Sequence, residues 1–273
     1  MSAVISDERA CAVRSSTARA RVARRLTVEM IHRSGEGHYG GSLSPIDILA
    51  VLYESFVAPN GMDRVILSKG HGAPGYYGVL AERGMVALES LADYGQVGAA
   101  LQGHPDMTTE PAIHFSTGSL GQGLSVGLGM ALALRGRGRV WVILGDGECQ
   151  EGQVWEAAML AERLRLSNLI AIVDANKYQE WGFRHNCRAT TPLRAAIEKW
   201  RAFGWHAAEV DGHDHDQLWS AFTQVSIGEN GPAVLIANTI KGKGAALFES
   251  DPDRFHCTAL TDEEYRTVLE ELR

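Results

Sequence analysis

The chain has 273 residues, of which 45% are hydrophobic and 22% are charged, a composition typical of one compact, soluble α/β domain. Its formal net charge of −7 leaves no broad basic surface for the phosphate backbones of nucleic acids or for anionic membranes, so both are excluded as partners. Small anionic ligands are still compatible with local sites.

The amino-terminal region is predicted to be a helix. Its arginines would also suit a transit peptide, but Asp7 and Glu8 and the apolar spacing of Val22, Leu26 and Met30 favour an amphipathic helix. Further helix-like stretches follow within the first 135 residues, joined by glycine-rich connections.

Two features of the composition indicate the cellular compartment of the protein. The longest apolar stretch, residues 123–134, falls short of the ~18 residues of a membrane-spanning helix, so no segment is predicted to span a membrane. The cysteines are too scattered for a disulfide scaffold or a CxxC metal site: Cys11, Cys149, Cys187 and Cys257. We therefore expect a cytoplasmic protein.

The segment GEGHYG, Gly35 to Gly40, formally matches the dinucleotide-binding pattern GxGxxG. It follows a helical stretch, whereas that pattern has to follow a strand, so we treat the match as accidental. Ser44 is predicted to cap the next helix, with Pro45 at its first position. Gly40 and Gly41 are predicted to let the backbone approach a ligand closely.

From Arg139 onward, apolar runs alternate with helical segments, which indicates βα units and a mostly parallel sheet. The predicted strands are Val140–Leu144, Leu169–Val173, Trp205–Val210 and Ala233–Ala237, and the predicted helices are Gln153–Leu164, Pro192–Phe203 and Asp216–Ile227. Thr261, three residues before Glu264, predicts a capping box for a final surface helix. Because no linker or internal repeat interrupts the pattern, residues 1–273 are predicted to form a single domain.

The strongest chemical signal is the turn Gly145-Asp146-Gly147, directly after a predicted strand. Asn176 follows the next strand, so both polar side chains are predicted at the carboxyl ends of neighbouring strands, where open parallel sheets bind ligands. A carboxylate, an amide oxygen and a backbone carbonyl suit Mg²⁺, with about three positions left for phosphate oxygens and water. Gly147 and the amides of the following helix would receive the phosphate. The alternative is an ordinary turn with Asp146 as the helix N-cap.

Three histidines lie next to glycine, outside any regular apolar pattern: His38, His71 and His104. They suggest a lined pocket. A zinc site is the alternative, although no pair has the i, i+4 spacing of helical zinc ligands. The segment 211–215, Asp-Gly-His-Asp-His, is interpreted as a polar turn rather than a site.

Together these motifs resemble the transketolase family over nearly the whole chain, specifically its thiamine diphosphate-binding domain and the stand-alone N-terminal subunit of split transketolases. GDGECQEGQVWEA followed by DANK resembles the family's thiamine diphosphate motif. GHYGGSLS, DRVILSKGH, LQGHPD and STGSLGQG stand in the family's order at similar spacings. The resemblance implies a three-layer α/β fold, with a mostly parallel sheet flanked by helices.

The resemblance also implies site residues. Cofactor and metal contacts would come from Gly118, Leu120, Asp146, Gly147, Glu151, Asn176 and Tyr178. Of these, Asp146, Asn176 and the backbone carbonyl of Tyr178 would hold magnesium, and Glu151 would be the carboxylate at the subunit interface. Four histidines would complete the site: His38, His71, His104 and His256. The first three would surround the thiazolium ring and bind substrate oxygens, and the last would reach the diphosphate.

In the family, thiamine diphosphate supplies the chemistry that moves a two-carbon ketol unit from a ketose, commonly a sugar phosphate, to an aldehyde. The glutamate that activates the aminopyrimidine ring lies on a second domain. Since this sequence ends at Arg273, we expect a separate C-terminal subunit with the pyrimidine-binding domain, in an α2β2 assembly with a large obligate interface.

Three positions depart from the family pattern. Tyr39 replaces a proline, Glu180 stands where an apolar residue is usual, and Cys257 stands where glycine is common. The sugar substrate therefore does not follow from the resemblance alone. The alternatives are another thiamine diphosphate-dependent ketol or acyl transfer, such as a deoxyxylulose-phosphate-synthase-like condensation, and a non-catalytic subunit that kept the fold.

Overall fold

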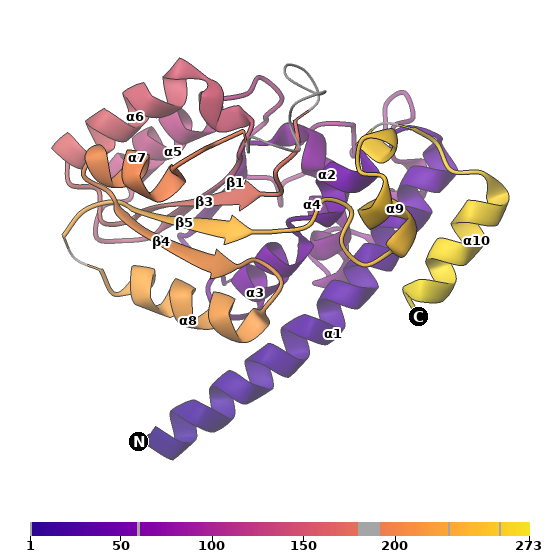
Figure 1. The fold of residues 1–273 in the computed structure, drawn as a ribbon, viewed down its shortest axis with the longest axis horizontal. Coiled ribbons are helices and arrows are strands. Elements are labelled where there is room, and N and C mark those ends of the chain that lie inside the picture. Colours follow the sequence, from indigo (N-terminus) through magenta and orange to yellow (C-terminus); the bar gives the residue numbers. More distant parts are fainter. Residues whose placement is uncertain (1, 59–60, 180–191, 229, 257) are drawn as a thin grey trace.

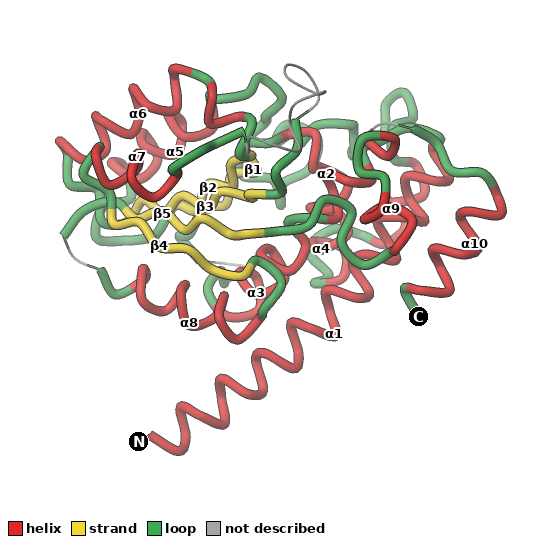
Figure 2. Tube along the Cα trace, in the orientation of Figure 1, coloured by secondary structure: helices red, strands yellow, loops and turns green. Residues whose placement is uncertain are grey.

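The computed structural model describes residues 2–58, 61–179, 192–228, 230–256 and 258–273, with side chains from Asp7 onward except that of His256. Its centre is a parallel sheet of five strands in the order β1-β2-β3-β5-β4. The strands are β1 Arg64–Leu67, β2 Val140–Gly145, β3 Leu169–Ala175, β4 His206–Asp211 and β5 Ala233–Asn238. Helices cover both faces of the sheet (Figure 1, Figure 2), which confirms the predicted three-layer α/β fold.

Two hydrophobic clusters separate the three layers. One layer contains α1 Ser2–Ser34, α3 Ile46–Ser55, α4 Ala73–Glu82 and α8 His215–Ser226, and the other contains α5 Gln122–Ala133, α6 Gly152–Arg163 and α7 Ala196–Ala202. Successive strand residues point to opposite faces, so Trp141 and Ile143 of β2 join the first cluster while Val142 and Leu144 join the second. Burial on both faces explains why β2, β3 and β5 are nearly continuous apolar runs in the sequence, whereas the edge strand β4 is mostly exposed.

The remaining helices are short, apart from the last: α2 Tyr39–Leu43, η1 Gly70–Gly72, η2 Leu88–Asp93, η3 Glu148–Gln150, α9 Ala246–Ser250, η4 Arg254–His256 and α10 Asp262–Glu271. In Figure 1 the strand arrows point toward α2 and α9. The carboxyl end of the sheet therefore faces the loops and short helices that carry most of the glycine-rich motifs.

The four strands predicted after Arg139 are confirmed to within two residues at each end, but the sequence reading missed β1. This strand has only four residues and lies inside the DRVILSKGH motif. It pairs with β2 at the edge of the sheet, with Val65 opposite Trp141. A run this short has no periodic signal of its own, and its partner lies more than seventy positions away.

The predicted amino-terminal helix is confirmed as α1, and on its predicted apolar face Met30 is buried and Leu26 packs partly buried against the core. Val22 is 48% exposed, whereas Ala20, Ala23, Thr27 and Ile31 are buried against α3 and α4. The small residues Ala20 and Ala23 let the neighbouring helices approach closely, because helix packing selects for fit as well as for hydrophobicity.

The predicted N-cap at Ser44 is wrong. Pro45 is the N-cap of α3 and makes no side-chain capping bond, and the helix begins at Ile46. The Ser44 hydroxyl instead donates to Oδ2 of Asp174 at the end of β3, 2.6 Å away. The Ser44 hydroxyl therefore makes a tertiary hydrogen bond in place of the capping bond that the local pattern predicted.

The predicted capping box is confirmed at α10, where the Thr261 hydroxyl accepts from Glu264 N and the Glu264 carboxylate accepts from Thr261 N. Replacing Thr261 with alanine is expected to lower the free energy of unfolding by about 1 kcal/mol, because two amides at the helix start lose partners. Urea denaturation would measure the loss. Thr267→Ala, inside the same helix, is the matched control, and an equal effect of both substitutions would contradict the capping role.

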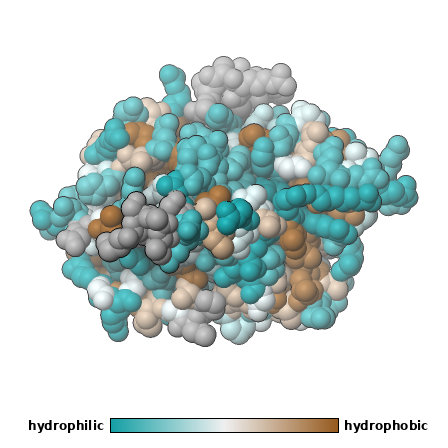
Figure 3. Space-filling model, turned by 90° about the horizontal axis from the view of Figure 1, so that it is seen from below, coloured by the Kyte–Doolittle hydropathy of each residue, from teal (hydrophilic) through white to brown (hydrophobic). Residues whose placement is uncertain are grey.

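Within the described ranges, no helix is long and apolar enough to cross a membrane. Figure 3 shows the face that lies below in Figure 1, on the side of α1 and α8. Polar residues predominate on it, and the apolar ones gather in separate patches.

Candidate active site

A cavity of about 520 Å³ lies at the carboxyl end of the sheet. Its wall includes every predicted site residue whose side chain is described: His38, His71, His104, Gly118, Leu120, Asp146, Gly147, Glu151, Asn176 and Tyr178. The fold has brought together residues that are spread over 140 positions of the sequence. The remaining predicted residue, His256, belongs to η4, and its side chain lies outside the described set.

Asp146 and Asn176 directly follow β2 and β3, which are neighbours in the sheet. Asp146 accepts hydrogen bonds from Gly147 N at Oδ1 (2.9 Å) and from Lys177 N at Oδ2 (2.7 Å). Asn176 accepts one from Tyr178 N at Oδ1 (3.1 Å). Backbone amides thus orient a carboxylate and an amide oxygen, both buried, on adjacent strand ends.

A buried ion pair lies beneath these groups. Asp174, at the end of β3, accepts from Lys69 Nζ at 2.5 Å, from Ser44 and from the Thr239 hydroxyl. Burial alone would raise the pKa of Asp174, but the Lys69 ammonium and these hydrogen bonds hold it below its usual value. Asp174 is therefore a fixed negative charge next to Asp146.

Burial and the charge of Asp174 raise the pKa of Asp146 to about 7, although the amides of Lys177 and Gly147 act in the opposite direction. A carboxylate in such a place gains strongly from a divalent cation, whose charge would keep it ionised. With the oxygen of Asn176 beside it, the donor set fits Mg²⁺, which prefers oxygen ligands.

The raised pKa predicts how stability depends on pH without metal. The folded chain keeps the Asp146 proton up to about pH 7, whereas the unfolded chain loses it near pH 4, so unfolding releases a proton between these values. The free energy of unfolding should therefore fall by about 1.4 kcal/mol per pH unit from about pH 4 to 7, relative to Asp146→Asn, and then level off. Urea denaturation in a chelator at several pH values tests this, and parallel curves for the two proteins would contradict it.

The alternative role of Asp146 as a helix N-cap is excluded. Glu151 is the N-cap of α6, which begins at Gly152. A 3₁₀ turn, η3, lies between Asp146 and that helix. The helix predicted at Gln153–Leu164 is confirmed as α6, within one residue at each end.

The glycines near the histidines make room for protein side chains. A Cβ on Gly41 would lie 2.8 Å from His71 Cδ2, and one on Gly118 (φ +154°) would lie 3.2 Å from His104 Cδ2. At Gly40 the added atom would meet Lys241 at 2.9 Å. Gly41 itself lines the cavity, so the predicted close approach of its backbone to a ligand stays a prediction, and its lack of a side chain also makes room for His71. Gly40 does not line the cavity, and it makes room for Lys241 instead.

The rings of His38 and His71 lie close together, with centroids 5.7 Å apart and planes at 63°. In the part of the chain that the structure describes, no group of three or more His, Cys, Asp or Glu side chains is arranged to hold a metal ion. The zinc alternative has no geometric support there. The histidines line the cavity as potential hydrogen-bonding groups.

Glu148 is a residue of the cavity wall that the sequence reading missed. It is buried, its Oε1 accepts from Gly121 N (2.9 Å) and contacts the Ser68 hydroxyl, and its Oε2 accepts from Gly145 N (3.0 Å). Burial raises its pKa, and these bonds act against the rise. Glu148 joins the loop before α5 to the end of β2. Its position directly after Gly147 was the signal that could have identified it.

The other missed wall residues are polar as well: Lys69, Gln150, Gln179 and Lys241. Lys241 is only 3% exposed, and its Nζ lies 5.5 Å from the centroid of the Tyr178 ring. It follows β5 in the turn Ile240-Lys241-Gly242. Like Asp146, Lys241 is a charged residue between an apolar strand and a glycine. This position could have identified it as a residue of the cavity wall.

Of the three departures from the family pattern, the structure describes one. Tyr39 is buried and stacks on Phe248, with ring centroids 5.0 Å apart, and burial raises its pKa above the ordinary value. It is a core residue behind the cavity wall. Glu180 and Cys257 lie outside the described residues.

Comparison with known proteins agrees with the interpretation of this cavity as a cofactor site. Residues 15–272 match the family of the transketolase thiamine diphosphate-binding domain. The chain is 42% identical to the 6-deoxy-6-sulfo-D-fructose transketolase subunit SqwG of Clostridium sp. (strain MSTE9), over 93% of this chain and 94% of that protein. It is 38% identical to one of the subunits of the apulose-4-phosphate transketolase of Actinobacillus succinogenes, over 92% and 93% of the two chains. Transketolase from Campylobacter jejuni has a similar structure, with a TM-score of 0.83 and 27% identity, over 95% of this chain and 43% of that one.

The fold and site thus define a thiamine diphosphate-binding α/β protein. The chain belongs to the transketolase family, as an N-terminal subunit that corresponds to the thiamine diphosphate-binding domain of the longer enzymes. The predicted family and the predicted transferase function, as one half of a two-subunit enzyme, are confirmed.

Proposed function

We propose that this subunit, with thiamine diphosphate and Mg²⁺ bound, transfers a two-carbon ketol unit from a ketose with an anionic end group to an aldehyde. The observation that carries the proposal is the cavity, in which Asp146, Asn176 and the histidines meet at the ends of neighbouring strands. The anionic end group is inferred from two relatives, which are named for a sulfonated fructose and a phosphorylated apulose.

Asp146, Asn176 and the backbone carbonyl of Tyr178 would hold the metal. The first two supply oxygens that backbone amides already orient, so little rearrangement is needed. Gly118, Leu120 and Gly147 line the same wall and would contact the cofactor. His256 remains our proposed contact to the diphosphate.

When bound, thiamine diphosphate supplies the carbon nucleophile and the electron sink that ketol transfer requires. The chain's own contribution is hydrogen bonding at the substrate. His38, His71 and His104 come from three separate segments and line the cavity, so they can orient a ketose from several sides and exchange protons with its oxygens. His71 and His104 pack closely on Gly41 and Gly118, and this placement limits the number of orientations in which a ketose can bind.

The partner in this proposal is a C-terminal subunit with the pyrimidine-binding domain, in an α2β2 assembly, with residues 1–273 as the single diphosphate-binding domain. Both subunit relatives match along more than nine-tenths of their length, which supports a two-chain enzyme. Glu151 is exposed at the cavity and would face the partner. Large apolar side chains are exposed on and beside α5 and α6, as expected for such an interface: Leu120, Leu132, Met159 and Leu160. We place the enzyme in the cytoplasm, in keeping with its scattered cysteines.

Calorimetry and a transfer assay test the proposal. Thiamine diphosphate with Mg²⁺ is titrated into the chain, into the candidate C-terminal partner and into their mixture, and ketol transfer from sulfonated, phosphorylated and neutral ketoses is then measured. We expect tight binding and transfer only in the mixture, with a preference for anionic ketoses. Binding without transfer from any ketose would favour a different thiamine diphosphate-dependent reaction, and absence of binding would favour the non-catalytic subunit.

A further inference from the structure

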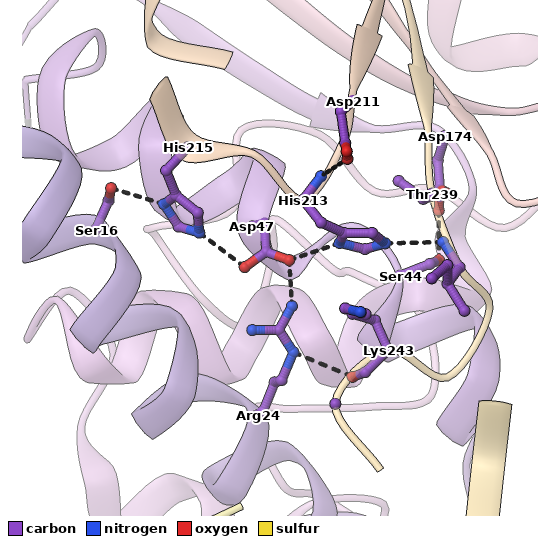
Figure 4. A network of polar contacts seen from close by, with 12 residues as sticks. Ser16, Arg24, Ser44, Asp47, Asp174, Asp211, His213, His215, Thr239 and Lys243 are labelled. Carbon is purple, nitrogen blue, oxygen red and sulfur yellow. Dashed lines mark hydrogen bonds and ion pairs between the residues drawn. The ribbon is translucent and has the colours of Figure 1, made fainter. Parts of the chain in front are cut away.

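Two histidines face inward where β4 leads into α8 (Figure 4): His213 in the turn and His215 at the first position of α8. His213 contacts Oδ2 of Asp47 through Nδ1 (2.7 Å), and His215 contacts Oδ1 through Nε2 (2.9 Å). Asp47 belongs to α3 and is buried. The predicted polar turn within residues 211–215 is present, and both of its histidines hydrogen-bond to the buried Asp47.

The hydrogen bonds of His213 define its protonation. The amide of Ile240 donates to His213 Nε2 at 2.8 Å, so that nitrogen carries no proton. Nδ1 then carries the proton and donates it to Asp47. His213 is therefore a neutral ring that links a buried carboxylate to the backbone just after β5.

Asp47 also reaches the same segment by a second route. Its Oδ2 pairs with Arg24 of α1, whose Nε donates to the carbonyl of Lys243 at 3.1 Å. Burial would raise the pKa of Asp47, but the two histidine hydrogen bonds and the Arg24 charge hold it well below its usual value. An ionised Asp47 thus anchors both Ile240 and Lys243, through His213 and Arg24 respectively.

Lys241 lies between these two anchored residues. Its neighbours Thr239 and Gly242 are held as well, by Asp174 and by the carbonyl of Gly40 (3.1 Å). A lysine side chain has four flexible carbon bonds, so the direction of its ammonium depends on a fixed backbone. Here that backbone is held by groups outside the cavity, on α1, α3 and the β4–α8 turn.

We propose that His213 is a positioning residue, which is held by Asp47, bonds the amide of Ile240 and thereby keeps Lys241 in the wall of the cofactor cavity. His213 does not line the cavity, so any effect on ligand binding has to pass through the 239–243 segment. The placement of Lys241 by His213 does not depend on the proposed function. Only the choice of ligand in the binding test rests on that function.

Hydrogen exchange on the full chain tests the placement. In His213→Phe, which keeps a ring but lacks both nitrogens, the Ile240 amide is expected to exchange about tenfold faster or more. His206→Phe, exposed at the start of β4, is the matched control and should leave that amide unchanged. His213→Gln keeps an acceptor for Ile240 and should exchange at an intermediate rate, and it replaces the phenylalanine variant if that protein does not fold. Wild-type exchange at Ile240 in the folded variants would overturn the proposal.

A double-mutant cycle tests whether His213 acts through Lys241. The dissociation constant of thiamine diphosphate with Mg²⁺ is measured for the assembled two-subunit enzyme carrying His213→Phe, Lys241→Gln or both. We expect each single variant to weaken binding by about tenfold or more, and the double variant to match Lys241→Gln. Additive effects, or a His213→Phe enzyme that binds as wild type does, would overturn the inference while leaving the proposed function intact. Failure of the wild-type enzyme to bind would instead contradict the proposed function, and the exchange experiment would still decide the role of His213.

Discussion

Asp146→Asn is expected to raise the dissociation constant of the Mg²⁺–thiamine diphosphate complex by about 100-fold or more, since removing one charge of a buried pair costs about 3 kcal/mol. The other buried carboxylate of the described cavity wall, Glu148, is engaged by two backbone amides and by Ser68. Asp146 also accepts from two amides, but it follows β2 next to Asn176 at the end of β3, and we therefore propose it as the metal ligand. The same substitution should stabilise the metal-free chain at neutral pH, because asparagine has no charge to bury.

This pairing of weaker binding with higher stability separates a metal ligand from a structural residue. Loss of a purely structural carboxylate would lower both quantities. Calorimetric titration of the two-subunit mixture gives the affinity, and urea denaturation in a chelator gives the stability. Asp7→Asn on the exposed start of α1 is the control and should change neither. An Asp146→Asn protein that still binds the cofactor in a Mg²⁺-dependent way would place the metal elsewhere.

Gly75→Ala is expected to lower the free energy of unfolding by about 3 kcal/mol or more. In the interior of a helix such as α4, this substitution ordinarily stabilises. Here the new Cβ would lie 2.0 Å from the carbonyl oxygen of Ser42, so α4 and α2 would have to separate. His38 directly precedes α2, and His71 lies just before α4, so cofactor binding should weaken as well.

The matched control is Gly129→Ala, in the interior of α5. A Cβ there meets no atom within 4 Å, so alanine should stabilise the chain by about 0.5 to 1 kcal/mol through its better helix propensity. Urea denaturation of both variants measures the two effects. If the two substitutions changed stability in the same direction, close packing of α2 on α4 would not be the reason for glycine at position 75.

The strands β2, β3 and β5 could be predicted because each is buried on both faces and is therefore a nearly unbroken apolar run in the sequence. The edge strand β4 is mostly exposed, and it was predicted from the alternation of strands and helices. The capping box at Thr261 could be predicted because both of its hydrogen bonds are local. The same reasoning failed at Ser44, where the local pattern was equally good. A buried Asp174, 130 positions away in the sequence, offered the hydroxyl a stronger partner than a helix amide.

The residues of the candidate site also divide into those that local patterns could predict and those that only the structure revealed. Asp146 and Asn176 were identifiable because their positions after consecutive strands place them on one edge of a parallel sheet. Lys241 and Glu148 have equivalent positions after strand ends and could have been found by the same rule. His213 could not, because its partner Asp47 lies 166 positions earlier and nothing near either residue marks the contact.

The sequence by itself determined the transketolase family, the order of the βα units after Arg139 and the residues that gather at the cavity, since these depend on local patterns and on motif order. Only the tertiary structure decided which groups touch. It packed His71 against Gly41, and it connected the segment that carries Lys241 to α1 and α3. It also buried Asp146 next to the charge of Asp174, and both effects raise the pKa of Asp146. These outcomes depend on burial and on contacts between segments far apart in the chain, which leave no signature in the residues next to them.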